Sequence, residues 1–235
     1  MRERQVKVLE NLDAVSQFAL DSLKGLLERS DQNVTIALSG GSTPKRLFEM
    51  MAQASLPLNR LELYWGDERY VPHDHKDSNY RMTRESLLAH AAVPASQVHP
   101  WPYLDTPQAS ADAYEQLLVS RFGGVNQVGF DVVLLGMGED GHTASLFPGT
   151  AALSVRDRAA VANHVEKLDS WRLTMTYPVF ENSRHVWFLA CGAGKADIIP
   201  RVLAGEDFPS AHVRSGGELV WMLDEAAAAK LEART

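Results

Sequence analysis

The stretch Asp131-Val-Val-Leu-Leu-Gly-Met-Gly-Glu-Asp-Gly-His-Thr-Ala-Ser-Leu-Phe-Pro-Gly149 decides the fold of this chain. Its first residues form an apolar run, which predicts a strand buried on both faces of a parallel sheet. The glycines that follow predict a turn, which presents His142 beside an acidic pair and ahead of a short helix start. Ligands of open α/β sheets bind at the carboxyl ends of the strands, so we expect an active-site loop here.

Composition limits the classes of protein to which the chain can belong. It has 235 residues, of which 45% are hydrophobic, and we expect one α/β domain over residues 1–235. The 23 Lys and Arg residues against 30 Asp and Glu give a net charge of −7, which argues against a nucleic-acid partner. No window approaches the ~18 consecutive apolar residues of a membrane-spanning helix. The single cysteine, Cys191, and an N-terminus without an apolar signal core indicate a reducing cytoplasm.

Apolar periodicity predicts strands that alternate with helices. The expected strands are 34–38, 61–65, 130–135, 186–190 and 218–223, and the expected helices are 12–29, 44–50, 78–90, 111–122 and 226–229. The first strand is expected near residue 33, and residues 94–110 are expected to be a surface connection. This alternation implies right-handed crossovers. We therefore expect a Rossmann-like α/β fold, with a mostly parallel sheet flanked by helices on both faces.

Polar clusters follow four of the expected strands and should share one edge of the sheet. They are Ser39–Thr43, Asp67–Arg69, Asp140–His142 and Gly194–Lys195. The first resembles an anion cradle, because glycine loops expose backbone N–H groups and a helix start adds the positive end of its dipole. An ordinary turn in which serine or threonine caps the helix remains an alternative.

Three side chains in these clusters are candidates for chemistry. His142 can serve as a general base, because an ordinary histidine has a pKa of about 6.5 and a neighbouring carboxylate can orient it. The planar guanidinium of Arg69 suits phosphate oxygens, although a surface ion pair is the simpler alternative. Lys195 opposes the dipole at a helix start, which favours an anionic ligand over a merely solvated lysine.

Other chemistries are not favoured. Gly136–Gly141 matches a dinucleotide-binding pattern, but its acidic residues and the break at Pro148 argue against a pyrophosphate site, and a Walker A motif is absent. The pair His73 and His75 is too weak a signal for a metal site, so we predict no metal. No Gly-x-Ser-x-Gly elbow occurs, and Cys191 ends an apolar strand, where an inert thiol is expected.

Five motifs together resemble the 6-phosphogluconolactonase family, within the broader glucosamine-6-phosphate isomerase/deaminase-like superfamily. They occur in the family's order across nearly the whole chain. They are Ser39-Gly-Gly-Ser-Thr-Pro44, Trp65-Gly-Asp-Glu-Arg-Tyr-Val-Pro72 with Ser78-Asn-Tyr80, Gly136–Gly149, Arg172-Leu-Thr and Gly194-Lys-Ala196.

The resemblance implies a glucosamine-6-phosphate isomerase-like fold, no cofactor, and a small-molecule sugar-phosphate lactone as partner. It implies hydrolysis of 6-phospho-D-glucono-1,5-lactone to 6-phosphogluconate in the oxidative pentose phosphate pathway. His142 would act as general base and then as general acid, and Asp140 or Asp67 would position the histidine or the sugar hydroxyls. The phosphate and its end of the sugar would be held by Gly40, Gly41, Ser42, Thr43, Arg69, Arg172 and Lys195.

Two alternatives remain within this superfamily. In the isomerase/deaminase branch a ring-opening glutamate stands where this chain has Phe147, and a tyrosine typically stands where it has Arg69, which disfavours aldose–ketose chemistry. A sugar-phosphate effector module of a transcription regulator is the non-enzymatic alternative. It would need a DNA-binding unit, for which the single helix expected before the first strand and the negative net charge offer no support.

Overall fold

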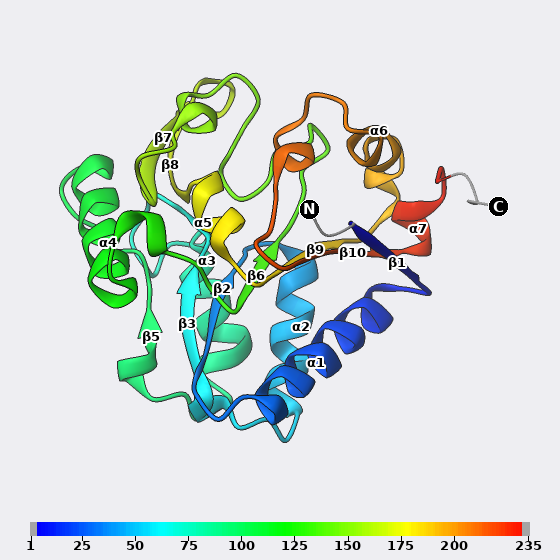
Figure 1. Ribbon diagram of the computed structural model, residues 1–235, viewed down its shortest axis with the longest axis horizontal. Helices are drawn as coiled ribbons and strands as arrows, with labels where there is room; N and C mark the ends of the chain where they lie inside the picture. The colour runs from blue at the N-terminus through cyan, green and yellow to red at the C-terminus, as the bar shows by residue number, and fades with distance from the viewer. Residues whose placement is uncertain (1–3, 232–235) are drawn as a thin grey trace.

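The computed structural model describes residues 4–231, and its main sheet is parallel throughout. The sheet has seven strands in the order β1-β10-β9-β6-β2-β3-β5 (Figure 1). This confirms the predicted α/β class and the predicted parallel pairing. The strands are β1 (Gln5–Leu9), β2 (Val34–Leu38), β3 (Leu61–Trp65), β5 (Val98–His99), β6 (Val132–Leu135), β9 (His185–Ala190) and β10 (Glu218–Asp224).

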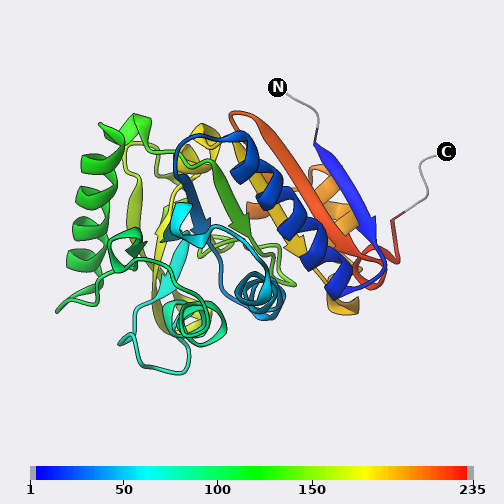
Figure 2. The ribbon, with the colours of Figure 1, turned by 90° about the horizontal axis from the view of Figure 1, so that it is seen from below.

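Helices cover both faces of this sheet, as predicted. Figures 1 and 2 show α1 and α2 on one side, with α5 and α6 on the other. The helices are α1 (Leu12–Arg29), α2 (Ser42–Gln53), α3 (Asn79–Thr83), α4 (Pro107–Phe122), α5 (Tyr177–Asn182), α6 (Ile198–Ala204) and α7 (Glu225–Ala228). Short 3-10 turns complete many of the connections.

Local sequence explains why the predicted elements form. Asn11 caps α1, because its side chain accepts a hydrogen bond from the backbone N–H of Ala14 at 3.0 Å. The apolar stripe of α1 is buried, and the helix ends at Arg29 as predicted. Every residue of β3 and β6 is buried, as expected of strands covered on both faces.

The prediction that the first strand begins near residue 33 was wrong. β1 precedes α1 and pairs in parallel with β10 at the edge of the sheet. Its side chains are mostly exposed, and Gln5 and Lys7 alternate with Val6 and Val8. Such an edge strand lacks the continuous apolar run that marked the central strands.

A second sheet was not predicted at all. It is antiparallel, has three strands in the order β4-β8-β7, and packs beside α4 (Figure 1). The chain passes from β3 into β4 at Gly66, whose N–H bonds to the main sheet at Leu38 and whose carbonyl accepts from Met175 of the second sheet. Its strands are β4 (Asp67–Arg69), β7 (Ala160–Val165) and β8 (Ser170–Met175).

Three further expectations need correction. No helix begins after His142, because the segment stays irregular as far as a 3-10 turn at Ala151–Ser154. The expected helix 78–90 is α3 followed by a π-helical turn at Arg84–Leu88. The expected surface connection 94–110 contains β5 and the start of α4, which Thr106 caps.

Candidate active site

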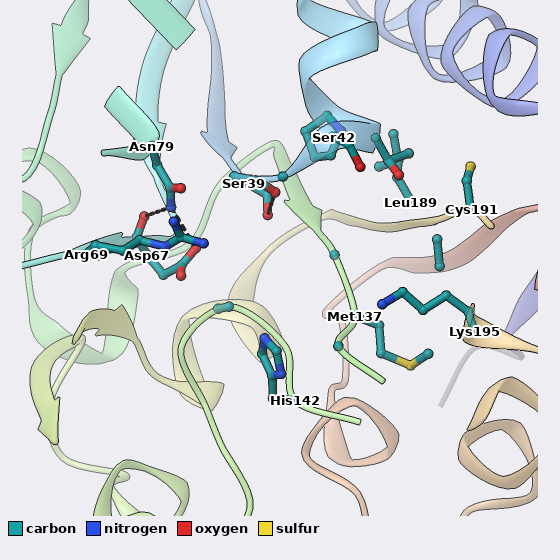
Figure 3. Close-up of a pocket in the computed structure, with 18 residues that line it drawn as sticks. Ser39, Ser42, Asp67, Arg69, Asn79, Met137, His142, Leu189, Cys191 and Lys195 are labelled. Carbon is teal, nitrogen blue, oxygen red and sulfur yellow. Dashed lines mark hydrogen bonds between the residues drawn. The ribbon is translucent and has the colours of Figure 1, made fainter. Parts of the chain in front are cut away.

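Two adjoining cavities lie at the carboxyl ends of the parallel strands. Their volumes are about 270 and 520 Å³. They share a wall, so we treat them together as the strand-end pocket (Figure 3). The residues that line both cavities are Asp67, Arg69, Gly138, His142, Ala144 and Lys195.

All the site residues expected from the sequence lie at this pocket. The first cavity is lined by Gly40, Gly41, Ser42, Thr43, Asp67, Arg69, His142 and Lys195. The second adds Asp140 and Arg172. Most of them come together because β2, β3, β6 and β9 are neighbouring parallel strands whose carboxyl ends face the same way. Arg172 comes instead from β8 of the small sheet, which pairs with β4 beside Arg69.

The loop after β6 holds His142 in one orientation. Two hydrogen bonds within the loop hold its shape. The Gly138 N–H donates to the His142 carbonyl at 2.9 Å, and the Thr143 hydroxyl donates to the Gly136 carbonyl at 2.8 Å. The ring stacks on Phe147, with centroids 4.1 Å apart and planes 18° apart. The imidazole points into the strand-end pocket (Figure 3).

Asp140 determines which ring nitrogen of His142 is available. Its Oδ1 lies 2.6 Å from Nδ1 of His142. An ionised carboxylate can only accept, so a neutral His142 donates from Nδ1 and keeps the lone pair on Nε2. Nε2 is therefore the nitrogen that can take a proton within the pocket.

The surroundings of His142 keep it neutral near pH 7. Burial lowers its pKa to about 4, the nearby Asp67 opposes this, and the cations Lys195, Arg69 and Arg172 reinforce it. A histidine that is uncharged in the free protein can act as a base without first losing a proton.

The His142 imidazole packs so closely on Gly138 that a side chain at position 138 would displace it. A Cβ at this position would lie 2.0 Å from Nδ1 of His142 and 2.7 Å from Oδ1 of Asp140. We expect Gly138→Ala to displace the ring and to lower the catalytic rate about 100-fold, the scale of a 1 Å misplacement. The control is Gly205→Ala, which also replaces a glycine, at φ +88°, but whose added Cβ would meet open space. The measurement is kcat of both variants. Equal kcat values for the two variants would contradict this account.

Asp67 is a buried carboxylate with fixed oxygens. It is 6% exposed, and its Oδ2 accepts a hydrogen bond from Ser145 at 2.7 Å. The Asn79 amide donates to the Asp67 carbonyl at 2.9 Å, and Figure 3 shows the two residues joined. Asn163 in turn donates to the Ser145 carbonyl at 2.9 Å. These contacts fix Asp67 at the wall of the strand-end pocket, near His142.

The start of α2 is suited to an anion. Its N-cap is Gly41, at φ 106°, and no side chain caps the helix, so the alternative of an ordinary turn capped by serine or threonine was wrong. The first N–H groups of α2 therefore have no side-chain acceptor. By contrast, Asn11, Ser78 and Thr106 cap other helices of the protein.

Besides Lys167, which pairs with Asp140, three cations line the strand-end pocket. Arg69 and Arg172 are paired positions on the antiparallel strands β4 and β8. Burial and the nearby Arg69 lower the pKa of Arg172. Lys195 reaches into the pocket from the turn after β9 (Figure 3). Like charges gathered in this way favour a ligand that carries negative charge.

The structure adds residues that the sequence analysis did not identify as parts of the site. Asn79 lines the first cavity, and Ser145 and Lys167 line the second. The family motif that joins Trp65–Pro72 with Ser78-Asn-Tyr80 could have indicated that Asn79 lies near Asp67. Nothing local in the sequence marks Lys167, which lies in the turn between β7 and β8.

Cysteine and metal chemistry find no support in this geometry. Burial raises the pKa of Cys191 to about 11, so its thiol stays protonated near neutral pH. The His73 ring bonds to the Trp101 carbonyl at 2.7 Å, whereas His75 pairs with Asp77. Within residues 4–231, no group of three or more His, Cys, Asp or Glu side chains could hold a metal ion.

No helix in the described part of the chain is long and apolar enough to cross a membrane.

Comparisons with known proteins agree with this geometry. The family of glucosamine-6-phosphate isomerases/6-phosphogluconolactonase matches residues 10–221. A 6-phosphogluconolactonase of Nostoc sp. is 42% identical over 239 residues, covering 97% of this chain and 99% of the relative. The structure of 6-phosphogluconolactonase from Trypanosoma cruzi has a TM-score of 0.89 at 32% identity and covers 98% of both chains. A monomeric glucosamine-6-phosphate deaminase, 22% identical with a TM-score of 0.81 over 96% of this chain and 99% of that one, shares the fold. The chain belongs to the glucosamine-6-phosphate isomerase/6-phosphogluconolactonase family.

Proposed function

We propose that this protein hydrolyses 6-phospho-D-glucono-1,5-lactone to 6-phospho-D-gluconate, the lactone-opening step of the oxidative pentose phosphate pathway. The relatives named 6-phosphogluconolactonase support this substrate. The observation that carries the proposal is the state of His142, whose Nδ1 is engaged by Asp140 and whose low pKa leaves Nε2 free to accept a proton.

In the first step, Nε2 of His142 takes a proton from water as the water oxygen attacks the lactone carbonyl. The imidazolium that forms is stabilised by Asp140 at Nδ1 and by the nearby Asp67. Negative charge develops on the carbonyl oxygen, which backbone N–H groups and cations of the pocket can stabilise.

In the second step, the tetrahedral intermediate collapses and the bond between the carbonyl carbon and the ring oxygen breaks. The proton held on Nε2 of His142 passes to that oxygen, which becomes a hydroxyl of the product. His142 is neutral again, and the new acid ionises in water. The cycle consumes one water and needs no other reactant.

The phosphate of the substrate would lie between the start of α2 and the cations of the pocket. Gly40, Gly41, Ser42 and Thr43 offer the helix N-terminus, and Arg69, Arg172 and Lys195 offer positive side chains. The reacting carbonyl would then lie toward His142.

Phe147 argues against the deaminase alternative. It is 5% exposed and stacks on the catalytic histidine, so a phenyl ring occupies the place where ring opening would need an acid. We expect no release of ammonia from glucosamine 6-phosphate. Such release would revive that alternative.

We also propose that residues 1–235 act as one α/β domain in the cytoplasm. One hydrophobic cluster includes Leu63 of the main sheet and Leu173 of the small sheet, which supports a common core. A reducing compartment would keep Cys191 as a thiol.

The direct test is the rate of hydrolysis of freshly generated 6-phosphogluconolactone, corrected for its spontaneous hydrolysis. Acceleration that saturates with lactone and scales with protein concentration is the expected result. A corrected rate of zero would refute the proposed function.

The low pKa of His142 predicts an unusual pH profile. The base is active when neutral, so kcat/KM should hold constant down to about pH 5 and fall on acidification through about pH 4. The acid fall of kcat should lie at a higher pH than that of kcat/KM. The phosphate of the bound substrate offsets the cations that lower the pKa of His142. A half-loss of kcat/KM near pH 6.5, the range of an ordinary histidine, would contradict this prediction.

A further inference from the structure

Lys167 reaches the active-site loop from a distant part of the chain. It lies in the 3-10 turn Glu166–Leu168, which joins β7 to β8, and its ammonium pairs with Oδ2 of Asp140. The other oxygen of the same carboxylate binds Nδ1 of His142 at 2.6 Å. Asp140 therefore bridges the Lys167 ammonium and the His142 imidazole.

A second contact brings Lys167 to the same group of side chains. Its Nζ lies 5.0 Å from the centroid of the Phe147 ring, and His142 stacks on that ring. A cation near an aromatic face is attracted by the ring quadrupole. Lys167 thus contacts both side chains that fix the orientation of His142.

The turn that carries Lys167 has a defined shape and lines the pocket. The β7–β8 ladder runs to its last pair, Val165 with Ser170, and Asp169 adopts a left-handed conformation at φ 41° to complete the turn. Both Lys167 and Leu168 line the larger cavity. The turn is thus a wall of the strand-end pocket.

We propose that Lys167 is a positioning residue, which acts through Asp140 and Phe147 to hold the His142 imidazole at the pocket and to offset the charge of Asp140. This role rests on the proposed function of His142 as general base. Stability alone does not explain the ion pair, because the Lys167 side chain is 52% exposed and such pairs contribute little.

The charges around His142 determine in which direction its pKa should change when Lys167 is removed. The His142 backbone N–H also donates to Oδ1 of Asp140 at 3.2 Å, so the carboxylate stays beside the ring when Lys167 is lost. Without the cation, Asp140 stabilises the imidazolium more strongly and the pKa of His142 rises. The other charges that face the ring are Asp67 and Arg69 on β4, Arg172 on β8 and Lys195 after β9.

The test compares Lys167→Met with Lys167→Arg and with Lys230→Met. The first variant removes the cation, the second keeps one, and the third breaks another exposed lysine–aspartate pair, Lys230 with Asp197, outside the pocket lining. The readouts are the titration of His142 by ¹⁵N NMR without substrate and the pH dependence of kcat and KM for the lactone.

In Lys167→Met we expect the pKa of His142 to rise by about one unit and the acid limb of kcat/KM to move with it. On the alkaline plateau kcat should fall severalfold while KM stays constant. Lys167→Arg should restore both readouts, and Lys230→Met should match the wild type. An unchanged His142 titration in Lys167→Met, or a rise in KM alone, would overturn the positioning role.

These outcomes separate the two proposals. If the wild type hydrolyses the lactone and His142→Ala does not, an unshifted titration in Lys167→Met refutes the positioning role alone. If the wild type does not hydrolyse the lactone, the proposed function fails, and the NMR titration still decides whether Lys167 acts on His142.

Discussion

Replacing His142 with alanine is expected to lower kcat for lactone hydrolysis about 1,000-fold, within the range that a positioned general base contributes. The variant loses the base that activates water and the acid that protonates the ring oxygen. The substrate contacts proposed for the start of α2 and for the cations are unaltered, so KM should change little. The measurement is the corrected initial rate on freshly prepared lactone.

The control for this prediction is a second histidine–aspartate pair. Nε2 of His212 lies 2.6 Å from Asp207, the same separation as in the His142 pair, but His212 does not line the strand-end pocket. His212→Ala should retain wild-type kcat. Binding of 6-phosphogluconate, followed by calorimetry, should survive in His142→Ala. An active His142→Ala enzyme would exclude the general-base role.

The central strands and their converging ends could be predicted because their physical signal is local. β2, β3 and β6 are covered on both faces and therefore appear in the sequence as mostly apolar runs followed by glycine or polar residues. Once they are taken as parallel, their carboxyl ends must share an edge. The sequence alone therefore predicts that Ser42, Asp67 and His142 lie together.

The small sheet could not be predicted in the same way. β4 has only three residues, and its partner β8 lies far along the chain. The pairing of Arg69 with Arg172 depends on the register between these strands, which no local pattern specifies. The reach of Lys167 to Asp140 depends on the same tertiary arrangement. The sequence therefore predicted the residues around the base better than the contacts that hold them.

A buried carboxylate explains why two separated motifs form one unit. Glu68 is 3% exposed and lies in β4 beside Asp67. Its Oε1 accepts hydrogen bonds from the backbone N–H groups of Asn79 at 2.7 Å and Arg69 at 2.8 Å. Its Oε2 accepts from the Tyr80 N–H at 2.8 Å and the Ser78 hydroxyl at 3.1 Å. Burial raises the pKa of Glu68, and these backbone donors oppose the rise.

We expect Glu68→Ala to lower the free energy of unfolding by about 3–5 kcal/mol, because it leaves several buried N–H groups without an acceptor. Glu68→Gln should lose less, since one amide oxygen still accepts while the amide nitrogen cannot. Activity should fall as well, because α3 carries Asn79, whose amide holds Asp67. The measurement is the urea-unfolding midpoint at constant slope.

Glu85→Ala is the matched control for Glu68, since it removes a glutamate from an exposed pair with Arg81 in the segment that follows α3. Its midpoint should stay near that of the wild type. We expect the urea-unfolding midpoint to fall in the order wild type, Glu85→Ala, Glu68→Gln, Glu68→Ala. This order tests whether the loss of a buried acceptor, rather than the loss of a charge, determines stability. If Glu68→Ala unfolds at the same urea concentration as Glu85→Ala, Glu68 does not hold the start of α3.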